Sequence, residues 1–425
     1  MQDHYGNPLH TTSQTARDGY NAAFGAYLEA QPGVEDALER ALAADPEFAQ
    51  ALMIRARNHH SYSRMTEAKA DITRAMALRA DLPNPARAQI EIFDHLIHGR
   101  TAEGYARIRA HLLEHPRDAL VAQTCLGVFS LIGFSGQPGR EAEHLAVAEA
   151  LAPAYGDDGW FQGQLAFAQM EAGQLKPAEA SITAALEQTP RSGHASHIRA
   201  HLFYEMGETA EGLAYLTEWM AQYDRAGLMH CHNSWHIALW ALAQGDEARM
   251  WAVVDDALLP EVTQSPKLNV LTDLASLYWR AGLKGVEVPS ARWRALAEYA
   301  AQTFPQPALG FADVHVALAH AMTGQDEALA RIVEGAKGPA ADIVAPCAAA
   351  FGHVARGQWG EAEAALIPVM VDHARLGGSR AQRDLIEHTM LQVLIRQGKA
   401  DEARRLLAMR RPTTDSAGAV AGLAA

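Results

Sequence analysis

The sequence contains little cysteine and few aromatic residues. Only three cysteines occur, Cys125, Cys231 and Cys347, and no two of them form a CxxC pair. A sparse, odd cysteine count fits a reducing compartment better than a disulfide-linked scaffold. Aromatic residues make up 7% of the chain, and alanine-rich strings replace the Val, Ile and Thr runs that are typical of β-strands. These shortages favour a helical protein without disulfides.

Long hydrophobic runs are also absent. No stretch approaches the roughly 18 consecutive apolar residues of a membrane-spanning helix. The N-terminal MQDHYGNPLHTTSQ is polar and lacks the apolar segment of a signal peptide. We therefore expect a cytoplasmic protein with no membrane partner.

Positive charge is in short supply. The chain has 36 Lys and Arg against 50 Asp and Glu, a net charge of −14. Clustered cations are what bind phosphate backbones, so we expect no nucleic-acid partner. Hydrophobic residues at 49% and charged residues at 20% are a globular composition, which excludes intrinsic disorder.

Prolines and glycines recur at similar intervals along the chain. The first five prolines of the set given below are 33–37 residues apart, and the sixth lies 70 residues further on. Glycines followed by an acidic turn recur with a similar spacing. Glycine ends a helix in a left-handed conformation, acidic residues favour the start of the next helix, and proline ends that helix. The prolines are Pro46, Pro83, Pro116, Pro153, Pro190 and Pro260, and the glycines are Gly173, Gly207, Gly245, Gly324, Gly357 and Gly398.

A period near 34 residues, with turn glycines and helix-ending prolines, resembles the tetratricopeptide repeat. We expect an all-α solenoid, a right-handed superhelix of about ten to twelve helical hairpins that encloses a central pocket. The solenoid spans residues 1–412, with irregular insertions near 126–160 and 260–312. Residues 413–425 have no periodic pattern and are expected to form a flexible tail.

Histidines gather at the helices expected to face inward. In HASHIRAHLFYE, His197 and His201 are four residues apart and share a helix face. In HCHNSWHIALW, His232 and His236 have the same spacing, with Trp235 between them. A single histidine on an apolar helix face is more often a packed core residue than a ligand. Several such clusters on consecutive inner helices instead favour a functional pocket.

Two further segments carry polar groups. FADVHVALAH places Asp313 and His315 at the start of an alanine-rich helix, and GGSRAQRD opens another helix. A helix start after two glycines can hold an anion, although Ser379 is more simply an N-cap. Large residues such as Trp160 could line a pocket or fill the core. The substrate-binding candidates are Trp160, His232, Trp235, Ser379, Gln382, Arg383 and Asp384.

These segments resemble the tetratricopeptide repeat protein 38 family. The resemblance lies in HIRAHLFYEMGE, HNSWHIALWALAQGD, DLASLYWRAGLKGV, FADVHVAL, GGSRAQRD and YGDDGWFQGQLAFAQMEAG, and covers most of residues 120–400. The family motif reads GGSHAQRD, so Arg380 stands here where the family has histidine. The biochemical activity of the family is largely unassigned, so the resemblance implies a fold and a candidate site without implying a reaction.

The favoured function is a small-molecule enzyme, a hydrolase whose catalytic residues are His201, His236, Asp313 and His315. A His–Asp pair that includes Asp313 would serve as general base. A second version adds zinc, iron or manganese, bound by His197 with His201, His236 and Asp313, to activate water. The alternatives are a non-catalytic tetratricopeptide scaffold for a peptide or protein partner, and a small-molecule sensor. The expected partners are a small molecule and a second copy of the chain in a homodimer.

Overall fold

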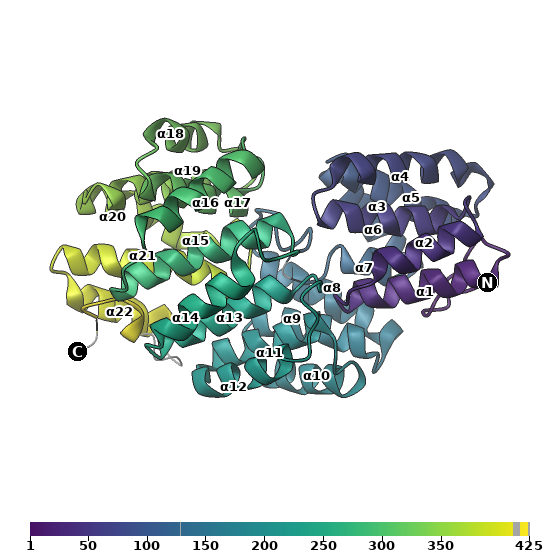
Figure 1. Ribbon diagram of the computed structural model, residues 1–425, viewed down its shortest axis with the longest axis horizontal. Coiled ribbons are helices and arrows are strands. Elements are labelled where there is room, and N and C mark those ends of the chain that lie inside the picture. Colours follow the sequence, from purple (N-terminus) through teal and green to yellow (C-terminus); the bar gives the residue numbers. More distant parts are fainter. Residues whose placement is uncertain (128, 411–416, 424–425) are drawn as a thin grey trace.

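The computed structural model describes residues 1–127, 129–410 and 417–423 (Figure 1). Within these ranges the chain is an all-α solenoid of the tetratricopeptide type, built from 22 α-helices with no β-strand. The α-helices are α1 (Gln14–Leu28), α2 (Val34–Ala44), α3 (Ala49–Ser61), α4 (Met65–Leu78), α5 (Asn84–Ile97), α6 (Thr101–Glu114), α7 (Ala119–Gln123), α8 (Arg140–Tyr155), α9 (Gly159–Glu171), α10 (Leu175–Gln188), α11 (Gly193–Met206), α12 (Thr209–Met220), α13 (His230–Ala243), α14 (Glu247–Val253), α15 (Lys267–Lys284), α16 (Ser290–Thr303), α17 (Gly310–Met322), α18 (Asp326–Gly335), α19 (Ala341–Ala355), α20 (Trp359–Asp372), α21 (Arg380–Arg396) and α22 (Ala400–Arg410). Short helical turns are η1 (Arg79–Asp81), η2 (Val254–Leu258), η3 (His373–Leu376) and η4 (Ala417–Ala419).

The predicted turn glycines lie between the helices of a pair. All six have a positive φ, between 67° and 79°. Gly207 is the clearest case, since it follows α11 with φ 75° and its N–H bonds back to the carbonyl of Tyr204. A residue with a β-carbon is strained in this conformation, so the glycines determine where each hairpin turns.

The prolines and insertions follow the prediction less closely. Pro46, Pro116 and Pro190 lie just beyond the ends of α2, α6 and α10, as expected. Pro153 lies inside α8 and does not end it. The insertion predicted at 126–160 is irregular only up to α8, and the one predicted at 260–312 contains the regular helices α15 and α16. The sequence analysis thus interpreted helical segments that lack the recurring turn glycines as irregular insertions.

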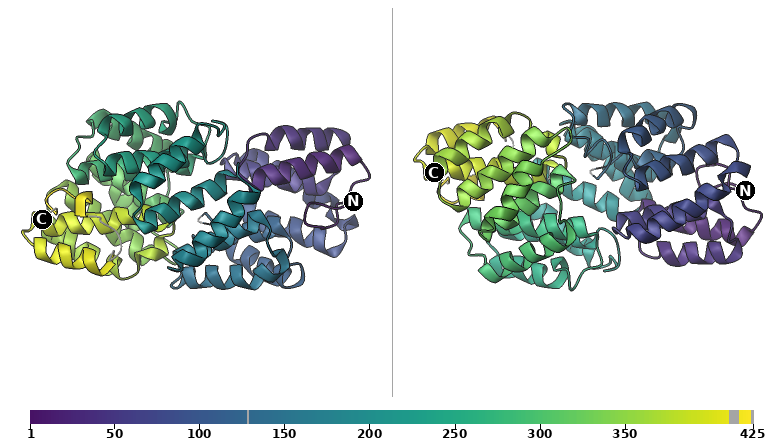
Figure 2. Two further views of the ribbon diagram at one scale, coloured as in Figure 1. Left: turned by 90° about the horizontal axis from the view of Figure 1, so that it is seen from below. Right: turned by 90° about the horizontal axis from the view of Figure 1, so that it is seen from above.

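The hairpins follow a curved path that brings the C-terminal helices back toward the middle of the chain (Figures 1 and 2). α1–α6 form one end of the molecule, and α13–α22 form the other. α21 packs against α15 and also contacts α11, which lies far earlier in the sequence. This return places side chains of α9, α11 and α21 next to one another. The enclosed central pocket expected from the sequence stays a prediction.

Two large hydrophobic cores fill the ends of the solenoid, one extending from Leu9 to Ala168 and the other from Cys231 to Leu423. The second core includes part of the segment predicted to be a flexible tail. Within that segment, residues 413–416, 424 and 425 lie outside the described residues. Val420 and Leu423 are buried, and the N–H of Ala421 donates to the carbonyl of Leu283 over 2.8 Å. No helix in the described ranges is both long enough and apolar enough to cross a membrane.

Candidate metal centre

Four histidines from two neighbouring inner helices converge on one point. His197 and His201 come from α11, and His232 and His236 come from α13. Each contributes one ring nitrogen to a group whose atoms all lie within 4.8 Å of one another. On each helix the two histidines are four residues apart, which places both rings on one face. α11 and α13 contact each other across successive hairpins, and their histidine-bearing faces meet there.

The four rings lie in the protein interior, with exposed fractions of 0–2%. Nε2 of His201 lies 2.7 Å from Nε2 of His197. Nε2 of His232 and both ring nitrogens of His236 are buried and have no hydrogen-bond partner. Buried polar atoms almost always have a partner, which can be water or an ion. The unpaired nitrogens are therefore atoms that a bound water or ion would satisfy.

Asp273 on α15 orients one of the four rings. Its carboxylate oxygens lie 2.8 and 2.9 Å from Nδ1 of His232, which donates the hydrogen bond. That bond leaves the lone pair of the ring on Nε2, the unpartnered nitrogen. A carboxylate behind a ligating histidine is a common arrangement in metal sites. The sequence analysis did not assign Asp273 a role; the signal it offered was one acidic residue inside the apolar run NVLTDLASLYW.

Aromatic side chains surround the rings. Trp235 stacks on His232 with ring centroids 5.1 Å apart and an interplanar angle of 11°, and Phe129 meets the same ring edge-on. Trp240 lies 5.8 Å from His236. This apolar lining limits the access of solvent to the rings.

Burial favours the neutral form of His197, His201 and His236. It lowers the pKa of His197 and His236 well below the usual range, and the neighbouring histidines lower both further. Burial also lowers the pKa of His201 to about 3. Neutral imidazoles are the form that ligates metals.

A small cavity adjoins the cluster at His197. Its volume is about 50 Å³, and its other lining residues include His194, Gln164 and Phe129. A cavity of this size holds one or two water molecules. This cavity is too small to be a substrate-binding pocket.

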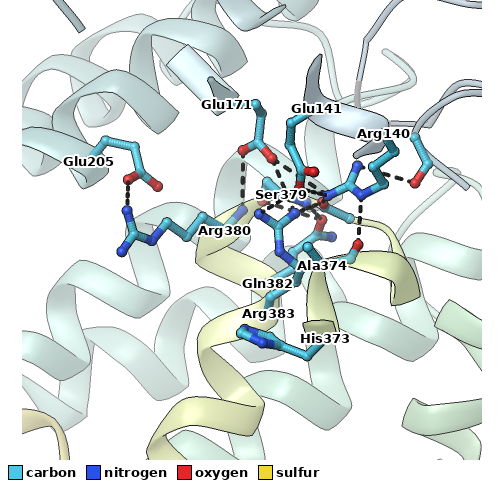
Figure 3. A network of polar contacts seen from close by, with 12 residues as sticks. Arg140, Glu141, Glu171, Glu205, His373, Ala374, Ser379, Arg380, Gln382 and Arg383 are labelled. Carbon is cyan, nitrogen blue, oxygen red and sulfur yellow. Dashed lines mark hydrogen bonds and ion pairs between the residues drawn. The ribbon is translucent and has the colours of Figure 1, made fainter. Parts of the chain in front are cut away.

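A second polar cluster lies where α21 meets α9 and the start of α8 (Figure 3). Arg140 donates to the carbonyl oxygens of Ala374, over 2.6 Å, and of Gly378, over 3.0 Å. Arg383 donates to Glu171 over 3.1 Å. Burial acts to raise the pKa of Glu171, but Arg383 and Arg140 hold it below the usual range. These buried ion pairs join segments more than 200 residues apart.

The sequence-predicted residues Ser379, Gln382 and Arg383 lie in this network (Figure 3), whereas Asp384 bonds elsewhere. The Ser379 side chain caps α21, and Oε1 of Gln382 accepts the Ser379 N–H over 2.9 Å in a capping box. The N-cap interpretation of Ser379 is thus confirmed, and the helix start is occupied by its own side chains. Asp384 accepts a hydrogen bond from Tyr204. Arg380 pairs with Glu205 over 3.4 Å.

Asp313 and His315 lie outside the four-histidine group. Asp313 accepts the Ala308 N–H over 3.1 Å and lines a separate cavity of about 300 Å³ with Pro305 and His320. Burial raises its pKa to about 6. His315 donates from Nδ1 to the carbonyl of Phe311 over 2.7 Å. The carboxylate that pairs with a cluster histidine is Asp273, and the fourth predicted metal ligand is replaced by His232.

Trp160 is also remote from the cluster. It packs with Tyr5, Tyr155 and Phe161 in the N-terminal core, so the core interpretation holds for this residue. Cys231 is fully buried, and its thiol contacts Asp273 over 3.8 Å. Burial raises the pKa of Cys231 well above the usual range, which suits an inert thiol.

Comparison with solved structures finds similar chains at low sequence identity. No protein-family model matches the chain, so the resemblance to the tetratricopeptide repeat protein 38 family stays a prediction. Human IFIT1, solved as a dimer with m7Gppp-AAAA, is similar at 13% identity and a TM-score of 0.46, covering 96% of this chain and 97% of that one. Yeast Tom70 is similar at 14% identity and a TM-score of 0.36, covering 94% and 84%. The P58(IPK) tetratricopeptide domain gives 13% identity and a TM-score of 0.20, covering 93% and 99%.

One prediction about partners needs correction. From the charge and the histidine clusters we expected a small-molecule partner and no nucleic acid. The IFIT1 structure carries a capped RNA, and a further similar structure is Naa15/Naa10 bound to HypK. These two similar structures thus carry an RNA and a protein partner, and a net negative charge alone does not exclude either class of partner.

Proposed function

We propose that the chain is a tetratricopeptide-like binding protein whose interior is held together by one transition-metal ion at the four-histidine cluster. The observation that carries this proposal is the convergence of four buried ring nitrogens within 4.8 Å. His197, His201, His232 and His236 would hold the ion, and Asp273 would orient His232.

The energetic argument concerns the buried nitrogens. An unpartnered buried polar atom costs about 1–3 kcal/mol, and this cluster has three of them on two rings. Four ligands at zinc–nitrogen distances of about 2.1 Å lie about 3.4 Å from one another in a tetrahedron. The four nitrogens, all within 4.8 Å of one another, would adjust their spacing toward this distance on binding zinc.

The donor set indicates the kind of metal. Imidazole suits zinc, copper, iron and nickel, and four nitrogen ligands in a closed tetrahedron suit zinc best. Manganese prefers oxygen ligands, and none belongs to the group of four histidines. Zinc is therefore the metal that we expect.

The closed donor set favours a structural role. Catalytic zinc sites generally have three protein ligands and keep a fourth position open for water or substrate, whereas structural sites use four protein ligands. Here four histidines from the chain fill the set, and the one adjoining carboxylate is engaged with His232. We therefore favour the non-catalytic scaffold over the hydrolase that the sequence analysis preferred.

Metal content tests the proposal. The untagged full chain, purified without chelators, should contain about one equivalent of zinc by inductively coupled plasma mass spectrometry. His236→Ala should lose most of it. The matched control is His315→Ala, which removes another buried histidine with an unpartnered Nε2 and should keep the metal. Equal, substoichiometric metal in all three proteins would overturn the proposal.

A further inference from the structure

The segment that follows α22 occupies a groove in the C-terminal core. Residues 417–423 lie against the C-terminal end of α15, and Val420 and Leu423 are each only 2% exposed. Both side chains belong to the same hydrophobic core as the helices beneath them. The segment therefore buries two aliphatic side chains three positions apart.

The backbone of the segment is held as well. The Ala421 N–H donates to the carbonyl of Leu283 over 2.8 Å, and the Leu423 N–H donates to the carbonyl of Val420 over 3.2 Å. The residues between the anchors are small and approach the helices closely: a β-carbon at Gly422 would lie 3.4 Å from Ile395. Backbone hydrogen bonds together with side-chain pockets are the usual way in which proteins bind peptides.

The segment leaves part of its groove unfilled. Gly418 and Ala419 line a cavity of about 140 Å³, next to Trp240, Arg280 and Lys284. Lys284 donates to the carbonyl of Ala243 over 2.6 Å, and burial lowers its pKa. A side chain larger than glycine or alanine at these two positions would have room there. The groove thus accepts a bulkier peptide than the segment that it holds.

We propose that this groove is a binding site for a short, turn-forming peptide of a partner protein, with two aliphatic anchors three residues apart, and that residues 417–423 are a competing occupant in cis. The inference rests on the proposal that the chain works by binding a partner, but it does not depend on the metal. A tethered competitor has an effective concentration in the millimolar range. It lowers the affinity for an outside peptide in proportion to the fraction of time that the groove is filled.

The test uses a fluorescein-labelled peptide with the sequence AGAVAGLAA and the full chain with Val420→Asp and Leu423→Asp. The two aspartates release the segment because an unpaired charge does not enter an apolar pocket. Fluorescence anisotropy should show binding to this variant, and binding about tenfold or more weaker to the wild type, which corresponds to a groove filled at least about 90% of the time. A peptide with Asp at both anchor positions should not bind either protein.

Three readouts keep the result interpretable. Circular dichroism and metal content of the variant should equal those of the wild type, so that a loss of fold or of the metal centre is seen separately. Hydrogen exchange should show that residues 420–423 have become unprotected in the variant. With the segment released and the fold intact, absence of peptide binding would overturn the inference and leave residues 417–423 as a simple cap. Equal binding to variant and wild type would overturn the competition.

Discussion

His232 donates a hydrogen bond from Nδ1 to the carboxylate of Asp273, 2.8 Å away, and neither side chain is exposed to solvent. The bond links α13 to α15 and fixes which nitrogen of His232 faces the other three histidines. A carboxylate in this position also offsets part of the charge that a divalent ion brings into the interior. In the proposed zinc site Asp273 is therefore a positioning residue, and its replacement should weaken zinc binding.

Asp273→Asn should weaken zinc binding about 10- to 100-fold, the usual cost of altering a residue behind a metal ligand. The amide keeps the shape but loses the charge and the strong acceptor. Competition with a chromophoric zinc chelator measures the change. Asp313→Asn is the matched control, since Asp313 lines a separate cavity, and its zinc affinity should equal that of the wild type. An unchanged affinity in Asp273→Asn would mean that the carboxylate does not act on the centre.

Stability should fall in mild acid through buried histidines outside the cluster. Burial lowers the pKa of His144 and of His315 to about 4, from the ordinary 6.5. As the pH falls from 6.5 to 4, these histidines bind protons in the unfolded chain but not in the folded chain, so the free energy of unfolding decreases. Each group should cost up to about 3 kcal/mol across this window and nothing above it. Urea unfolding at a series of pH values measures the loss.

His144→Gln is the variant that isolates one of these groups. Nε2 of His144 accepts the Gly127 N–H over 3.1 Å, and a glutamine oxygen can take over that hydrogen bond without titrating. The dependence of unfolding free energy on pH should therefore become shallower between pH 6.5 and 4. The same steepness as in the wild type would show that His144 is not held neutral by burial.

Glu171→Gln should destabilise the chain by up to about 3 kcal/mol, because it removes one of the two carboxylates that face the buried arginines and leaves only Glu141. Arg383 and Arg140 lie 3.1 and 3.7 Å from the Glu171 carboxylate. Asp18→Asn breaks the exposed ion pair with Arg17 and should change stability by less than about 1 kcal/mol. Chemical denaturation of both variants gives the comparison, and similar small losses in the two would contradict the role assigned to the network in Figure 3.

Gly207→Ala should destabilise the hairpin between α11 and α12 by about 1–2 kcal/mol, since alanine is strained at φ 75°. Gly360→Ala provides the control within the same fold. Gly360 lies inside α20 with open space around its β-carbon position, so alanine there should stabilise by about 0.5–1 kcal/mol. Thermal unfolding should shift in opposite directions, and two shifts of the same sign would contradict the turn assignment.

Most of the fold could be predicted from the regularly spaced glycines and prolines of the repeats. Gly207 and Gly398 predicted turns that the structure has at the same residues, because a left-handed turn is a local requirement that few residues other than glycine meet. Pro153 misled because a proline inside a helix removes only one hydrogen bond, which α8 tolerates near its end. The packing of residues 417–423 could not be predicted, because small apolar residues without periodicity look alike in a tail and in a groove.

The sequence predicted each pair of histidines in the candidate centre, but it did not predict that the two pairs meet. The spacing of His197 with His201, and of His232 with His236, placed each pair on one helix face. Which two faces meet depends on how the hairpins pack, so the sequence alone wrongly grouped three of these histidines with Asp313 instead of His232. Asp273 was missed because its partner lies on another helix, 41 residues away.

A cobalt titration tests the four-histidine centre most directly. Metal-free full chain should bind one equivalent of Co²⁺ and develop the intense visible absorption that is typical of four-coordinate, tetrahedral cobalt, and zinc should then remove this absorption. His201→Ala should lose the absorption while His315→Ala keeps it. A wild-type chain that shows only the weak absorption of hexa-aqua cobalt, with its helical circular dichroism intact, would contradict the metal centre.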